Sequence, residues 1–146
     1  DLHSIARRQR SDVYKRQDFK RNTKGIVAHI DNIAFVAAEA AYSAAQEWYL
    51  ELLQYLKSNR NLLQERLNNI DGLSLKGPEA GFLAWIDCSE IGLDNPANFF
   101  IEEAGVGVYD GAWFGDKNYV RLNFGCPKSI LEEALNRIEK AFSQRN

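Results

Sequence analysis

The chain has 146 residues and a formal net charge of −2, with 45% hydrophobic and 12% aromatic residues. This length fits one domain, and a chain of this size buries roughly two thirds of its unfolded surface. No apolar run approaches the roughly 18 residues that a membrane span needs, so we expect no membrane protein. The two cysteines and two histidines match no metal-ligand or redox spacing, which argues against a metal site and favours a reducing compartment, the cytoplasm.

Basic residues gather at the N-terminus. Residues 1–24 carry eight Lys or Arg against three Asp, whereas residues 25–146 carry ten basic and seventeen acidic residues. A basic arm could recruit nucleic acid or another acidic partner. Residues 1–17, however, have no apolar periodicity, do not begin with Met, and include Ser11–Gln17, which resembles a translated sequencing adapter. We therefore expect residues 1–17 to be a non-native or disordered arm, with no nucleic-acid partner.

Residues 18–72 have a helical pattern. Small residues are frequent after Asn32, and Ser43-Ala44-Ala45-Gln46 has the spacing of a capping box, which predicts that a second helix starts there. Apolar residues then recur at helical spacing from Trp48 to Ile70, and Gly72 is the kind of residue that ends a helix. The segment is predicted to link this chain to a further domain through one long connecting helix.

The period changes after residue 72. Gly81–Asp87 is almost continuously apolar, which predicts a strand that is central or covered on both faces. Pro96 and Ser129 mark the starts of two helices. The other predicted strands cover residues 73–76, 106–109 and 119–124. Residues 73–146 are therefore expected to form a small C-terminal α+β domain, with a mainly antiparallel sheet and helices packed on it.

One arginine lies within the last of these strands. Val120, Leu122 and Phe124 alternate with Arg121 and Asn123, so the apolar side chains share one face and the polar ones the other. A guanidinium held on a strand offers paired donors to a carboxylate or a phosphate. The alternative is a strand arginine that simply faces water.

Several motifs, in chain order, resemble the C-terminal part of a known enzyme family. They are Ala37–Tyr42, Glu47-Trp48, Asp110-Gly111 with Phe114-Gly115, and the run Val120–Pro127. Together they resemble fold-type I pyridoxal-phosphate (PLP) enzymes of the class I/II aminotransferase family, with the MalY/PatB type of cystathionine β-lyase as the nearest branch. The resemblance covers residues 27–142.

The resemblance implies roles for four residues. Arg121 would bind the α-carboxylate of a cystathionine-like or cysteine-like amino acid. Asn123 would hold Arg121 in place, unless it is a plain strand asparagine. Trp113 and Phe114 would line the substrate entrance, unless they pack locally. The full-length protein would be a homodimeric PLP-dependent lyase.

The chain also departs from the family pattern. The lysine that bonds the cofactor belongs to a serine-rich motif that is not found here, so we expect a fragment that binds no cofactor and is inactive alone. Gly81-Phe82 stands where relatives tend to have Thr-Tyr. Two alternatives stay open: a fragment of an aminotransferase, and a non-catalytic α+β binding module with a basic arm.

Overall fold

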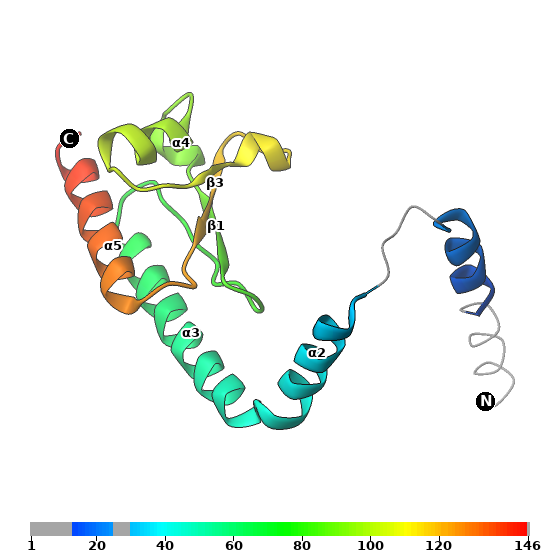
Figure 1. The fold of residues 1–146 in the computed structure, drawn as a ribbon. Coiled ribbons are helices and arrows are strands. Elements are labelled where there is room, and N and C mark those ends of the chain that lie inside the picture. Colours follow the sequence, from blue (N-terminus) through cyan, green and yellow to red (C-terminus); the bar gives the residue numbers. More distant parts are fainter. Residues whose placement is uncertain (1–12, 25–29, 146) are drawn as a thin grey trace, which may run out of the picture. The chain divides into compact units, whose positions relative to one another are not determined.

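The computed structural model describes residues 13–24 and 30–145, and the chain divides into two units, residues 1–46 and 47–146. In the first unit residues 13–22 are helical, and α2 spans Asn32–Ala44 (Figure 1). Asp31 caps α2, because its Oδ1 accepts a hydrogen bond from the Ala34 N–H at 2.7 Å. Residues 1–12 lie outside the described residues, so the arm boundary at residue 17 stays a prediction.

Ser43 does not start the second helix, and the capping-box prediction was wrong. Its hydroxyl donates to the Glu39 carbonyl at 2.6 Å, one turn back within α2. Serine often makes this i−4 bond inside a helix, and the bond removes the hydroxyl from capping. Helix α3 begins at Gln46 and runs to Leu67 (Figure 1), so the long helix predicted from the apolar spacing is confirmed.

The second unit contains an antiparallel sheet of three strands, in the order β1-β3-β2. The strands are β1 (Leu83–Asp87), β2 (Tyr109–Asp110) and β3 (Tyr119–Asn123). The Arg121 strand, β3, is therefore the central one, and the prediction that residues 81–87 are central was wrong. The bulky side chain of Trp85 lies on the sheet face away from the core, which a continuously apolar sequence does not reveal.

Helices α3 and α5 cover one face of the sheet. Helix α5 spans Lys128–Ser143 and lies beside the C-terminal half of α3 (Figure 1). The Arg66 guanidinium of α3 pairs with the Glu139 carboxylate of α5, with Nε 2.6 Å from Oε1. The buried core joins residues from both helices and the sheet: Leu63, Leu67, Ala84, Ile86, Val120, Leu122, Leu131, Leu135 and Ile138. The predicted α+β class with helices packed on a small sheet is confirmed.

Shorter elements complete the unit. Helix α4 (Pro96–Asn98) continues into a π-helical turn, η2 (Phe99–Glu103), and two 3-10 turns are η1 (Ser89–Ile91) and η3 (Gly111–Phe114). Of the strand predicted at residues 73–76, only a bridge between Ser74 and Asp87 forms. The predicted Ser129 cap is also wrong, because α5 starts one residue earlier and the Lys128 N–H donates to the Tyr55 hydroxyl.

Membrane-spanning helices and clusters of metal ligands are both absent from residues 13–24 and 30–145. None of their helices has both the length and the apolarity to cross a membrane. Their His, Cys, Asp and Glu side chains form no group of three that could hold a metal ion.

Candidate anion-binding site on the open face of the sheet

Arg121 lies at the centre of the sheet face that the helices leave open. Its cross-strand neighbours are Trp85 on β1 and Tyr109 on β2. Residues directly opposite each other in a sheet project to the same face, so these three side chains are grouped together. The alternation predicted for this strand is confirmed, since Val120 and Leu122 are buried on the other face.

Two aromatic rings hold the guanidinium of Arg121. Its Cζ lies 4.7 Å from the centroid of the Tyr109 ring and 4.2 Å from that of Phe114. A guanidinium over the face of a ring is attracted by the ring quadrupole, and the planar group stacks well there. We call Tyr109 and Phe114 the aromatic clamp.

The guanidinium has no partner of opposite charge. Among residues 13–24 and 30–145, no ion pair involves Arg121, and its Nε is buried without a hydrogen-bond acceptor. A buried donor without an acceptor typically costs about 1–3 kcal/mol. The Nη donors of Arg121 make no hydrogen bond within the described residues and are not fully buried, so an anion would bind there and not at Nε. The arrangement therefore suits a carboxylate or another small anion.

The Asp-Gly-x-x-Phe-Gly motif builds the turn that carries Phe114. Asp110 caps η3, because its Oδ1 accepts from the Ala112 N–H at 2.8 Å. Gly111 is buried, and a Cβ there would overlap the carbonyl oxygens of Asp116 and Tyr119. Gly115 ends the turn with φ 102°, a conformation that favours glycine. Asp110, Gly111 and Gly115 thus each have a local role in placing the Phe114 ring.

A second layer of contacts supports Phe114 from behind. The Trp85 ring meets Phe114 edge to face at 5.9 Å and stacks on Tyr119 at 5.2 Å. The Tyr119 hydroxyl donates to Asp87 Oδ2 at 2.8 Å, and the Ser89 N–H donates to Asp87 Oδ1 at 2.9 Å. The Ser89 N–H, and less strongly the Tyr119 hydroxyl, lower the pKa of Asp87. The hydrogen bond to Asp87 raises the pKa of Tyr119.

Asn59 of α3 fixes the end of β3. It is fully buried, and its Nδ2 donates to the carbonyls of Phe124 at 3.1 Å and Cys126 at 2.9 Å. Those bonds tie the end of the Arg121 strand to the long helix. The helical periodicity of this segment gave no sign of that role, because a buried asparagine has the same spacing as a buried leucine.

The other three predicted site residues make different contacts. Asn123 Oδ1 accepts from the Gly125 N–H at 2.8 Å, which closes the turn after β3 rather than bonding Arg121. Phe114 contacts Arg121 directly. Trp113 is 72% exposed and meets only the Tyr109 ring, at 6.0 Å, among the aromatic contacts of the described residues. Sequence reasoning missed Tyr109 and Trp85, which only the strand register brings to Arg121.

The two cysteines differ in environment. Burial raises the pKa of the Cys88 thiol to about 12, so this thiol is protonated at neutral pH. Cys126 is partly buried against the core. Both cysteines therefore pack with the hydrophobic core.

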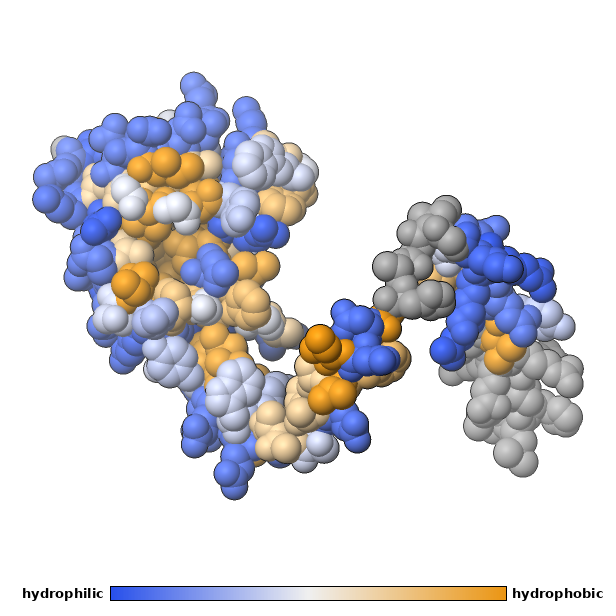
Figure 2. All heavy atoms as spheres, viewed as in Figure 1, coloured by the Kyte–Doolittle hydropathy of each residue, from blue (hydrophilic) through white to orange (hydrophobic). Residues whose placement is uncertain are grey.

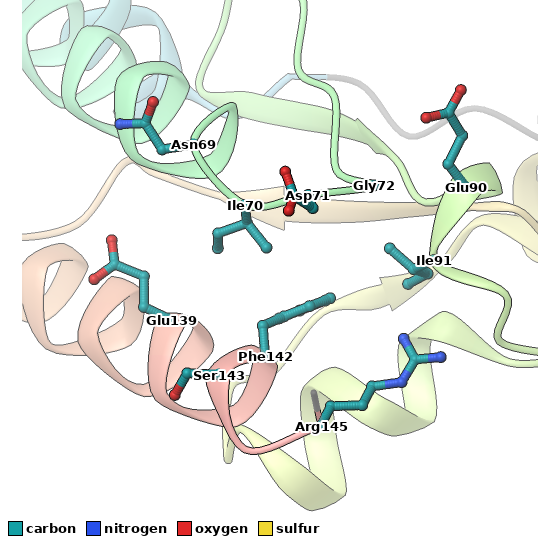
Figure 3. A pocket seen from close by; sticks show the side chains of 10 residues that line it. All are labelled: Asn69, Ile70, Asp71, Gly72, Glu90, Ile91, Glu139, Phe142, Ser143 and Arg145. Atoms are coloured by element: carbon teal, nitrogen blue, oxygen red, sulfur yellow. The ribbon is translucent and has the colours of Figure 1, made fainter.

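Two hollows lie away from Arg121. One, of about 630 Å³, lies between the end of α3, η1 and the end of α5, with Ile70, Ile91 and Phe142 facing it (Figure 3). Its Glu139 is already paired with Arg66. The other, of about 490 Å³, borders Gly107, Asn123 and α5. Arg121 lines neither of these two hollows.

Most of the chain is similar to known proteins. A family model described as aminotransferase class I and II covers residues 18–138. The chain belongs to this family. Cystathionine beta-lyase PatB of Bacillus subtilis (strain 168) is 30% identical to this chain over 119 residues. The match covers 78% of this chain and 31% of PatB. The suspected resemblance to MalY/PatB-type lyases is thereby confirmed.

Solved structures agree. The structure of OvoB matches this chain with a TM-score of 0.84 and 45% sequence identity. The match covers 88% of this chain and 34% of OvoB. The PLP-bound C-S lyase of Staphylococcus hominis shares 28% identity at a TM-score of 0.73, over 84% of the chain and 34% of the lyase. The fold is that of fold-type I PLP enzymes. The chain spans about a third of the length of each relative.

The residues around Arg121 fit a carboxylate better than they fit PLP. The clamp and the unpaired guanidinium supply an anion site, but none of the residues found in contact with Arg121 is a lysine. The lysines described in the second unit are all exposed: Lys57, Lys76, Lys117, Lys128 and Lys140.

Proposed function

We propose that this chain is the C-terminal part of a PLP-dependent carbon–sulfur β-lyase of the cystathionine β-lyase type. In the full-length protein Arg121 binds the α-carboxylate of a cystathionine-like or cysteine-like substrate. The supporting observation is the unpaired guanidinium, buried at Nε, at the centre of the open sheet face. Family membership supports an amino acid as the ligand.

The role of this chain is to bind and orient the substrate. The paired donors of Arg121 fix the carboxylate, and this direction sets which bond of the substrate faces the reacting centre. The Tyr109 and Phe114 rings shield part of the guanidinium from water, which strengthens the ion pair. PLP, when bound elsewhere in the full-length protein, supplies the electron sink for the bond cleavage.

Kinetics of the full-length protein test this role. Arg121→Ala should lower kcat/KM for the amino acid by roughly 30-fold or more, because truncating one partner of a buried charge pair costs about 2–5 kcal/mol. Cofactor absorbance should not change. Arg137→Ala is the matched control, since Arg137 is an exposed arginine of α5 that pairs with Glu133. Equal kcat/KM in wild type and Arg121→Ala would reject the proposal.

An aminotransferase is the second candidate, favoured by the family model that matches the chain. The same Arg121 would bind the carboxylate in either reaction, so mutation does not separate them. Pyruvate released from L-cystathionine without an acceptor supports the lyase. Activity that requires a keto-acid acceptor supports the aminotransferase.

The proposal also covers the oligomeric state and the cellular compartment of the full-length protein. We infer that the full-length protein is a cytoplasmic homodimer, as the family resemblance implies, and that its cofactor lysine lies outside this chain. The exposed lysines of the second unit support the latter point. On this basis the 146-residue chain should show no lyase or transaminase activity when mixed with PLP.

A further inference from the structure

The two rings of the aromatic clamp contact Arg121 from different elements of the fold. Tyr109 comes from β2 and Phe114 from η3, so two different elements contact the same guanidinium. Neither ring is an acid or a base suited to proton transfer to a carboxylate. Arginine has long, flexible side-chain torsions, and ordering them costs roughly 2 kcal/mol of rotamer entropy. A group that orders the arginine before the ligand arrives therefore strengthens binding without touching the ligand.

Each ring of the clamp is itself supported. Phe114 is held by the edge of Trp85, which stacks on Tyr119, whose hydroxyl is bonded to Asp87. The Tyr109 ring is met by Trp113 at an interplanar angle of 64°. The rings thus cannot move freely with the arginine, and they restrict where its guanidinium lies.

We propose that Tyr109 and Phe114 are positioning residues that preorganise Arg121 for its anion. The proposal rests on the carboxylate-binding function of Arg121 given above, and it adds two residues that act through Arg121. The clamp rings lie over the guanidinium carbon, and we expect the Nη donors to bind the anion. The aromatic character of the two positions matters, and the Tyr109 hydroxyl does not, because the contact is through the ring.

The first test needs no substrate and uses the 146-residue chain. In an NMR spectrum of the arginine side chains, the Arg121 Nε–Hε signal is identified by its loss in Arg121→Lys. We expect an upfield ring-current shift of that signal, with slow hydrogen exchange. Phe114→Leu should move the signal downfield and speed exchange, whereas Tyr49→Leu, which replaces an equally exposed aromatic of α3, should leave it in place. An unshifted signal in the wild type would overturn the proposal.

The second test measures kinetics of the full-length protein. Phe114→Leu and Tyr109→Leu should raise KM for the amino acid roughly threefold and change kcat by less than about twofold, in keeping with the strength of a cation–π contact between partly exposed side chains. Tyr109→Phe and Phe114→Tyr, which keep an aromatic ring at each position, should have the wild-type KM. Loss of kcat without a rise in KM would indicate a merely structural role and overturn the proposal.

The two proposals can fail separately. If Arg121→Ala raises KM and both leucine variants do not, the clamp proposal is overturned and the carboxylate role stands. If Arg121→Ala leaves KM unchanged while the NMR signal is ring-shifted, the rings still order Arg121, but its substrate role and the positioning role that depends on it are both rejected.

Discussion

At the scale of single residues, the site depends on a few polar groups whose partners come from distant parts of the chain. Asp87 and Tyr119 are 32 residues apart in sequence, yet their hydrogen bond supports the Trp85 ring. Because the pKa of Asp87 is lowered in the folded chain, its ionised form contributes stability above the ordinary aspartate pKa of about 3.9. That contribution is lost as pH falls through the lowered folded value.

This linkage predicts a change in acid sensitivity. Asp87→Asn should flatten the dependence of the free energy of unfolding on pH below about pH 5, since the variant has no carboxylate to protonate there. Urea unfolding of the chain at a series of pH values between about 3 and 7 measures it. Asp71→Asn, at an exposed turn aspartate, is the control. A curve for Asp87→Asn that parallels the wild type would show that Asp87 adds no pH-dependent stability.

At the scale of elements, η3 links a sequence motif to the site. The glycine-punctuated stretch 110–116 predicts a loop, and the loop is a 3-10 turn that carries Phe114 to Arg121. The motif gives the turn, but the direction of the ring depends on how closely η3 packs on the backbone of Tyr119. Only glycine permits that distance.

A substitution in this turn tests the point. Gly111→Ala should destabilise the chain by about 1–3 kcal/mol, because the added methyl group displaces backbone and not a flexible side chain. Gly107→Ala is the matched control, since a Cβ at Gly107 meets nothing within 4 Å. Urea unfolding gives both values. The expectation fails if Gly111→Ala unfolds at the same urea concentration as the control.

At the scale of the whole molecule, the second unit is a sheet with one face covered by α3 and α5 and the other face open. Helix α3 is more than a connection to the first unit, because Leu63 and Leu67 are core residues and Asn59 holds the end of the Arg121 strand. In the first unit, by contrast, hydrophobic side chains of α2 such as Ile33 and Val36 remain exposed. Figure 2 shows hydrophobic surface along this helix.

Asn59 offers a test of how strongly α3 is joined to the sheet. Asn59→Ala removes two hydrogen bonds and leaves the Phe124 and Cys126 carbonyls without their donor, so we expect a loss of about 1–3 kcal/mol in the free energy of unfolding. Asn61→Ala, at an exposed asparagine of the same helix, should change it by less than about 0.5 kcal/mol. Thermal unfolding of both variants makes the comparison. Equal midpoints would show that the amide does not join the two elements.

The amino-acid sequence by itself determined the α+β class, the long helix, the alternating strand of Arg121 and the family. These are consequences of local periodicity and short motifs, which act over a few neighbouring residues. Helix starts were predicted less well. Ser43 and Ser129 have the spacing of a capping box, but the Ser43 hydroxyl bonds to Glu39 within α2, and the Tyr55 hydroxyl accepts from the Lys128 N–H at the start of α5.

Only the tertiary structure decided which strand is central and what surrounds Arg121. The central place of β3 depends on its pairing with β1, more than 30 residues away, as well as with the nearer β2, and no local pattern records both. These two pairings bring Trp85 and Tyr109 to Arg121, and none of the described residues gives its guanidinium an acid partner. The arginine was visible in the sequence, but its aromatic surroundings arise from register, which is a property of the folded sheet.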